Sequence, residues 1–129
     1  MLDTNICIFL IKQKSNRLVE TLVAKNPRDI FISAVTVSEL YFGVENSQTI
    51  EKNKVLLETF LIPFQILDFD LEAAKSFGQL KAELKREGKA IGGAQDLQIA
   101  SHARACNLTL VTNDQGFKQG SSIKVEDWT

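Results

Sequence analysis

The chain has 129 residues, a length that suits one domain with a buried core. Its 15 basic and 16 acidic residues give a formal net charge of −1, which excludes a uniformly basic surface and leaves nucleic-acid binding to a local patch. No apolar stretch approaches a membrane span, and the first residues do not resemble a signal peptide. We therefore expect one cytoplasmic domain over residues 1–129 without membrane association.

The first half of the chain alternates short apolar runs with helical patterns. The expected elements are the end of a strand at 1–2, helices at 5–12 and 16–24, a turn at 27–29, a strand at 30–33, and helices at 36–45 and 50–61. The last of these helices is strongly periodic, and its predicted apolar side carries Val55, Leu56, Thr59 and Phe60. Pro63 follows and ends the helix.

The second half continues the alternation. Asp70 is suited to cap a long amphipathic helix that Gly88 ends, and Asn107 is suited to a left-handed turn after the last helix. The expected elements are strands at 64–69, 108–112 and 123–125, helices at 71–87 and 96–106, a Gly92-Gly93 turn, and a short turn or helix that begins at Phe117. Strands separated by helices predict a short parallel sheet between two helical layers, a three-layer α/β/α fold.

Four acidic residues lie where a predicted strand ends or a predicted helix begins, at Asp3, Glu39, Asp96 and Asp114. Ligand sites in parallel α/β folds form at the carboxyl ends of the strands, so distant carboxylates can converge there. Converging carboxylates repel one another unless a cation neutralises them, and oxygen ligands suit Mg²⁺ or Mn²⁺. Their joint placement indicates a metal-dependent phosphodiesterase.

Each acid also has a simpler local explanation. Asp3 is suited to cap a helix, and Thr36 with Glu39 has the spacing of a capping box. Asp96 would be stabilised by the dipole at the start of its helix, and Asp114 lies in a sequence typical of a turn. The functional interpretation therefore depends on the four residues together.

Other reactive residues have ordinary interpretations. Cys7 and Cys106 lack a metal-ligand spacing, so we expect free thiols. His102 follows Asp96 in the same predicted helix and is interpreted as a surface or packing residue, and its neighbour Ser101 as structural.

Four segments resemble a known family in the order in which they occur. They are Leu-Asp-Thr-Asn-Ile at 2–6, Ser-Ala-Val-Thr-Val-Ser-Glu-Leu-Tyr-Phe-Gly at 33–43, Asp-Leu-Gln-Ile-Ala-Ser-His-Ala at 96–103 and Leu-Val-Thr-Asn-Asp at 110–114, with Glu-Asp-Trp near the end at 126–128. The chain resembles PIN-domain ribonucleases of the VapC toxin family, from bacterial type II toxin–antitoxin pairs. The resemblance covers nearly the whole chain and implies a PIN-like domain.

The resemblance also implies the composition of the site. Asp3 and Asp96 would be the central ligands of one or two Mg²⁺ or Mn²⁺ ions, with Glu39 and Asp114 completing the acidic set. The residues implied to orient these carboxylates are Asn5, Thr112 and Asn113. A divalent cation would activate water for attack on phosphorus, so no protein nucleophile is needed.

The implied substrate is structured RNA, with a tRNA anticodon loop as the candidate target, and its cleavage would inhibit translation. The predicted phosphate-binding residues are Lys12, Lys81, Lys85 and Arg86, with Lys14, Arg17 and Lys89 nearby in sequence. The alternative for the second basic group is a solvated helix face, since Glu83 and Glu87 are interleaved with it.

Two protein partners are implied as well. One is a cognate antitoxin, whose C-terminal tail would lie across the acidic pocket and place an Arg there. The other is a second copy of the chain, since the family usually forms homodimers. The apolar helices at 5–12 and 50–61 are candidate surfaces, although their apolar faces can also be core.

Three other functions remain open from the sequence. A PIN- or flap-type nuclease of RNA processing or DNA repair would share the four acids. A receiver-type signalling domain would need an acceptor carboxylate, for which Asp68 is the only candidate, and a Lys directly after the strand at 108–112, where Asn113 stands instead. A catalytically inactive PIN domain that only binds a partner would not need four acids.

Overall fold

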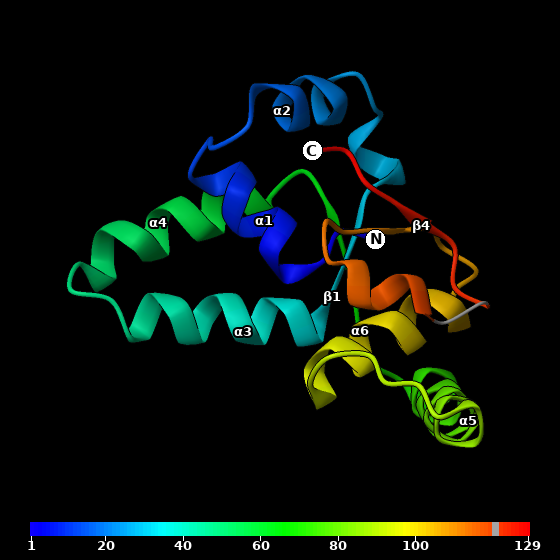
Figure 1. Ribbon diagram of the computed structural model, residues 1–129. Coiled ribbons are helices and arrows are strands. Elements are labelled where there is room, and N and C mark those ends of the chain that lie inside the picture. The colour runs from blue at the N-terminus through cyan, green and yellow to red at the C-terminus, as the bar shows by residue number, and fades with distance from the viewer. Residues whose placement is uncertain (120–121) are drawn as a thin grey trace.

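The computed structural model describes residues 1–119 and 122–129. A short sheet lies between two groups of helices (Figure 1). The helices are α1 (Thr4–Ile11), α2 (Asn16–Val23), α3 (Ala34–Glu45), α4 (Ile50–Leu61), α5 (Leu71–Glu87) and α6 (Ala94–Ala105). The other elements are β1 (Phe31–Ser33), β2 (Gln65–Leu67), β3 (Leu110–Val111), β4 (Val125–Glu126) and the 3₁₀ helices η1 (Pro27–Asp29) and η2 (Gln115–Gln119).

The start of the chain joins two pairs of parallel strands into one sheet. β1 pairs with β2, and β3 pairs with β4, both in parallel. Leu2 forms a parallel bridge with Val111, and its backbone N–H donates to the carbonyl of Phe31 at 3.0 Å. The resulting order is β2, β1, the segment at Leu2, β3 and β4, which confirms the predicted parallel sheet and the predicted strand end.

Two hydrophobic cores lie on opposite faces of this sheet. Leu2 and Val111 belong to the core under α1, α2, α3 and α4, whereas Met1 and Leu110 belong to the core under α5 and α6. Successive residues of a strand point to opposite faces, so even these two-residue segments contribute to both cores. The predicted three-layer arrangement is confirmed.

The start of α3 differs from the prediction. Ser33 caps the helix by accepting a hydrogen bond from the Val35 N–H at 3.1 Å, so α3 begins at Ala34. Thr36 is fully buried, and its hydroxyl has no hydrogen-bond partner among the described residues. The predicted capping box of Thr36 and Glu39 is therefore wrong, because both residues lie inside the helix.

The apolar side of α4 was also predicted wrongly. Leu57 is the residue that the core buries, at 2% exposure, whereas Val55 is 62% and Leu56 46% exposed. Phe60 packs on the edge of the core, as predicted. The apolar residues cover more of the helix circumference than its contacts with α1 and α3 can bury, so periodicity alone did not identify the buried face.

The predicted caps of the second half are confirmed. Asp70 accepts from the Ala73 N–H at 3.0 Å, Gly88 ends α5 at a φ of 66°, and Asn107 follows α6 at a φ of 54°. Arg104 of α6 holds Glu83 of α5 through two hydrogen bonds of 2.8 Å. Both cysteines are free thiols. In the described part of the chain, no helix has the length and apolar character needed to cross a bilayer.

Candidate functional site

Asp3 is the buried centre of the acidic group, at 3% exposure. It follows the sheet segment at Leu2 and caps α1, where its Oδ1 accepts from the Ile6 N–H at 2.8 Å. Burial raises the pKa of Asp3 above its usual value, and the negative charges of Asp96 and Asp114 raise it further. Hydrogen bonds from the Thr112 side chain and from Ile6 act in the opposite direction.

Asp114 reaches the same region from the end of β3. Its backbone N–H donates to the Thr112 Oγ1 at 3.0 Å, and its carboxylate accepts from the Gly116 N–H at 2.8 Å. The buried Thr112 hydroxyl therefore contacts both the Asp3 carboxylate and the backbone of Asp114. One side chain thus sets the relative positions of two acids that are far apart in sequence.

Asp96 is placed by the turn before α6. It lies in the first turn of the helix, and its Oδ2 is 3.4 Å from the backbone N of Gly93, the N-cap. Gly92 has a φ of 24°, and a Cβ at this position would overlap Asp96 Oδ2. The turn therefore needs glycine at 92 because any side chain there would displace the carboxylate.

Glu39 joins the group through α1. It lies in the middle of α3, and its Oε1 accepts from the Thr4 Oγ1 at 2.7 Å. Thr4 follows Asp3 directly, so this hydrogen bond places the Glu39 carboxylate beside the start of α1. The structure thus places Asp96 and Asp114 near enough to Asp3 for their charges to act on it, and Glu39 reaches the same region through the residue next to Asp3.

The family of the chain follows from comparison with known proteins. Residues 1–121 match the PIN domain. The chain is 42% identical to the tRNA(fMet)-specific endonuclease VapC of Shigella flexneri, across 100% of this chain and 97% of that protein. The chain belongs to the VapC family of PIN-domain proteins. It is also 40% identical to Ribonuclease VapC2 of Haemophilus influenzae, across 99% of this chain and 96% of that protein.

Solved structures give the same family. VapBC from Salmonella typhimurium bound to DNA matches with a TM-score of 0.93 at 40% identity, covering 100% of this chain and 97% of that one. VapBC2 from Rickettsia felis bound to a promoter DNA fragment matches with a TM-score of 0.90 at 40% identity, covering 100% and 98%. The expected VapC resemblance and the PIN fold are confirmed.

The donor chemistry of this VapC site fits a hard divalent cation. All four acids present oxygen only, and the like charges of Asp96 and Asp114 around Asp3 favour a cation between them. Each carboxylate also accepts a hydrogen bond from its own surroundings. Among the residues that the structure describes, no three His, Cys, Asp or Glu side chains are arranged to hold a metal ion as they stand. Ion binding would therefore require side-chain rotation toward one point.

The residues predicted to orient the acids differ in their surroundings. Thr112 has the contacts expected of such a residue. Asn5 is exposed and Asn113 is half-buried, and the described contacts to Asp3 come from Thr112 and Ile6 instead. Sequence reasoning missed Thr4, which holds Glu39; its position directly after Asp3 was the available signal.

The predicted basic residues of this VapC chain fall into two places. Lys81 and Lys85 line a groove of about 420 Å³ between α5 and the turn before α6. Lys89 lines the same groove, as do Gly92 and Gly93 beside Asp96, whereas Arg86 is exposed on the last turn of α5. The other group is separate: Lys12 follows the C-terminal end of α1, away from Asp3 at its start.

Proposed function

We propose that residues 1–129 form the nuclease domain of a cytoplasmic VapC toxin, an endoribonuclease that depends on Mg²⁺ or Mn²⁺ and cuts structured RNA to inhibit translation. The observation that carries this proposal is the buried Asp3, whose pKa is raised by burial and by the charges of Asp96 and Asp114. A folded protein keeps such an unfavourable group of acids where function needs it. The ribonuclease names of relatives at 40–42% identity support the same activity.

We assign the roles of the acids as follows. Asp3 and Asp96 are the central ligands, and Glu39 and Asp114 complete the set. The bound ion would supply an activated water molecule and offset charge on the phosphate. Thr112 fixes Asp3, and the glycine turn leaves room for the Asp96 carboxylate beside Gly92.

We propose tRNA as the substrate. The relative from Shigella flexneri is named a tRNA(fMet)-specific endonuclease. Lys81, Lys85 and Lys89 line the groove that ends at the Asp96 turn, and Phe77 lines it too, with the Lys81 ammonium 5.7 Å from the centre of its ring. Phosphates that flank the scissile bond can contact these lysines while the acids hold the ion. These local lysine contacts would allow the chain to bind RNA without a large net positive charge.

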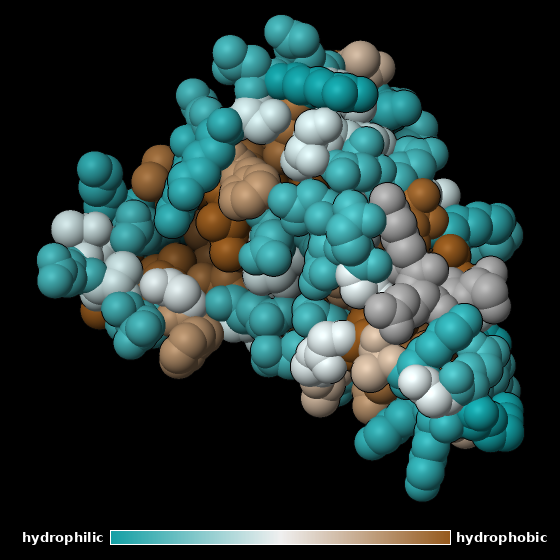
Figure 2. Space-filling model, viewed as in Figure 1, coloured by the Kyte–Doolittle hydropathy of each residue, from teal (hydrophilic) through white to brown (hydrophobic). Residues whose placement is uncertain are grey.

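We propose a cognate antitoxin as the regulatory partner. A second groove, of about 480 Å³, lies between α1, α3 and α4, and Figure 2 shows apolar surface in the hollow where these helices meet. Apolar side chains of an antitoxin can bury Ile8, Ile11 and Leu56, which line this groove. The antitoxin tail would continue to the acidic pocket and place an Arg there. A homodimer that brings two acidic sites together completes the proposed assembly.

The toxin role is tested by induced expression in a bacterial host, with Asp96→Asn as the matched variant. We expect growth arrest with the wild-type chain, no arrest with the variant at equal protein level, and sequenced RNA ends that map to one or a few tRNAs. Arrest by both proteins, or arrest without new RNA ends, would contradict the proposed function.

A further inference from the structure

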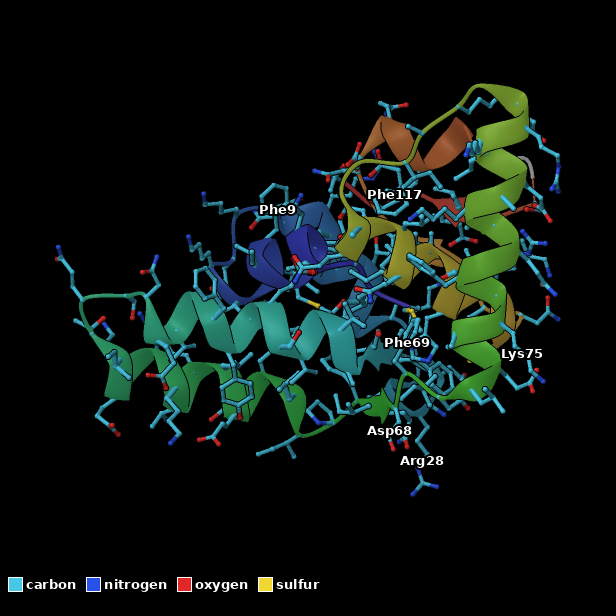
Figure 3. All side chains as sticks on the ribbon, turned by 90° about the horizontal axis from the view of Figure 1, so that it is seen from below. Phe9, Arg28, Asp68, Phe69, Lys75 and Phe117 are labelled. Atoms are coloured by element: carbon cyan, nitrogen blue, oxygen red, sulfur yellow. The ribbon has the colours of Figure 1, made fainter. Side chains whose placement is uncertain are left out.

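The single histidine of the chain is buried between three elements. His102 of α6 is 1% exposed, and its Nδ1 lies 2.8 Å from the Ser33 Oγ at the end of β1. Its ring also packs edge-to-face against Phe69, with centroids 5.4 Å apart, and Figure 3 shows Phe69 beside α6. This burial refines the prediction that His102 is a surface or packing residue. The nitrogens of a buried imidazole ring need hydrogen-bond partners.

The hydrogen atoms around the ring can be assigned from its partners. The Ser33 Oγ already accepts from the Val35 N–H at 3.1 Å, which leaves the Ser33 hydroxyl hydrogen free to donate to Nδ1. The backbone of Asp68 acts on the ring as an acceptor does, since it raises the pKa of His102, and a carbonyl can only accept. A neutral ring with its hydrogen on Nε2 satisfies all of these groups at once.

The surroundings favour this neutral form. Burial lowers the pKa of His102, and the charges of Asp70 and Asp68 act against burial. The ring is therefore part of a chain of hydrogen bonds that runs from α6 through Ser33 to the Val35 N–H at the start of α3, and it packs on Phe69 in the β2–α5 connection.

This chain of bonds connects the two helices that carry acids. His102 lies six residues after Asp96 on α6, and Ser33 lies six residues before Glu39 at the cap of α3. At 1.5 Å per residue, each acid is about 9 Å along its helix from the link. A rotation or shift of α6 against α3 would therefore move Asp96 relative to Glu39. By contrast, Ser76 ties α6 only to α5, where its hydroxyl donates to the Ser101 carbonyl at 2.7 Å.

We propose that His102 is a positioning residue of the nuclease site, which holds Asp96 in place relative to Glu39 through the Ser33 hydroxyl. The inference rests on the proposed function only for its effect on catalysis; the hydrogen-bonded link is a property of the folded chain. It differs from the acids, which would hold the ion, and from Thr112, which contacts Asp3 directly, because His102 would act only through the helices that carry Asp96 and Glu39.

The link can be tested without activity by nuclear magnetic resonance. Since His102 is the only histidine, ¹⁵N-histidine labelling of the protein without an affinity tag reports this ring alone. We expect the resonances of a neutral ring protonated at Nε2 at pH 7. Ser33→Ala should shift the Nδ1 resonance and, in a uniformly ¹⁵N-labelled sample, also the backbone amides of Gly93, Asp96 and Glu39. The matched control, Ser76→Ala, removes another buried hydroxyl contact of α6 and should leave the Nδ1 resonance and the Glu39 amide unchanged.

Kinetics then test the catalytic consequence. His102→Phe keeps the ring shape but cannot accept from Ser33, and we expect kcat to fall about 10- to 100-fold with little change in KM, as for a misplacement of about 1 Å. His102→Asn offers an oxygen near the Nδ1 position and should recover part of kcat. The double variant with Ser33→Ala should be no worse than Ser33→Ala alone, because both changes break the same bond and the loss of the α3 cap is common to both proteins.

The outcomes separate the two proposals. A wild-type ring in mixed tautomers, or a Ser33→Ala spectrum without shifts at Glu39 and Asp96, would overturn the positioning role. Equal losses of kcat in Ser76→Ala and Ser33→Ala would overturn it too, since general loosening of α6 would explain both. If the expected shifts appear but the wild-type chain cuts no RNA, the link stands and the proposed function fails. Should His102→Phe not fold, the small change Ser33→Ala decides the question with the same readouts.

Discussion

At the scale of single residues, the site combines one buried carboxylate with precise local contacts. Asp3 caps α1 and carries a charge that the fold disfavours, since its folded pKa lies above the ordinary value. Between the ordinary and the raised pKa, the folded chain binds more protons than the unfolded chain, so the contribution of Asp3 to stability falls as the pH rises through this window. Above this window and without metal, ionised Asp3 therefore destabilises the fold.

Asp3→Asn separates this electrostatic effect from the cap. Asparagine keeps the acceptor for the Ile6 N–H without the charge, so the metal-free variant should be at least as stable as the wild type. Asp3→Ala also removes the charge but loses the cap, which costs about 1 kcal/mol relative to Asp3→Asn. Thermal melts in EDTA measure both variants, and both should lose RNA cleavage. An Asp3→Asn variant that is clearly less stable than the wild type would contradict the electrostatic account.

Gly92→Ala tests the placement of Asp96. The added Cβ would overlap Asp96 Oδ2 and strain the backbone, so we expect cleavage to fall about 10- to 100-fold. Gly93→Ala is the matched control, because a Cβ at the neighbouring position meets nothing within 4 Å. Cleavage rates and melting curves of the two variants provide the comparison. Equal effects would mean that the turn as a whole, and not the Asp96 contact, requires glycine.

At the scale of elements, the sheet and its helices bring the site together through buried polar links. The segment at Leu2 sits between β1 and β3, which places Asp3 beside Thr112. His102 ties α6 to the start of α3, and Arg104 ties α6 to α5 through Glu83. These two contacts fix the orientation of α6 relative to α3 and to α5.

The buried His102 predicts a pH dependence of folding. Its folded pKa lies below the ordinary value of 6.5, so the unfolded chain takes up the proton first as the pH falls. The stabilisation is fully present above 6.5 and is lost as the pH decreases from there toward the lowered folded pKa. The slope from this one group reaches at most about 1.4 kcal/mol per pH unit. Urea unfolding between pH 5 and 8 measures it, and His102→Phe should flatten the curve; an unchanged slope would contradict the assignment.

The sequence predicted elements that are determined locally and missed features that depend on tertiary contacts. Asp70, Gly88 and Asn107 act through their own backbone, so their caps could be predicted. The start of α3 could not, because Thr36 is buried by packing rather than used as a cap. The four acids were found as a set from their positions at predicted strand ends and helix starts, and the family resemblance implied their roles. The role of His102 was missed because Ser33 is distant in sequence and becomes its partner only in the fold.

At the scale of the whole molecule, a net charge of −1 combines an acidic centre with a nearby basic groove. The acids supply negative charge at the site itself, whereas Lys81, Lys85 and Lys89 supply positive charge on one side of the site. RNA binding should therefore depend on a few lysines and on salt, and not on a general attraction to the protein surface.

Lys81→Gln and Lys85→Gln test this groove. Each change should raise KM for RNA, leave kcat nearly unchanged, and reduce the slope of log affinity against log salt by about 0.7 to 0.9. Lys75→Gln is the matched control on the same helix, because Lys75 pairs with Glu72 at 3.3 Å and does not line the groove. Binding to uncleaved RNA in EDTA at several salt concentrations provides the measurement. An equal effect of Lys75→Gln would mean that general charge, and not the groove, binds RNA.

The most direct test of the account is cleavage of a mixed tRNA pool by the purified protein, with Mg²⁺ or Mn²⁺, with EDTA, and with Asp96→Ala beside the wild type. We expect discrete cuts that need the divalent ion and disappear in the variant, which should remain folded because removal of one carboxylate relieves repulsion around Asp3. Cleavage that survives both EDTA and the substitution would contradict the assignment of the acidic site. Loss of folding in Asp96→Ala would show instead that Asp96 is needed to maintain α6.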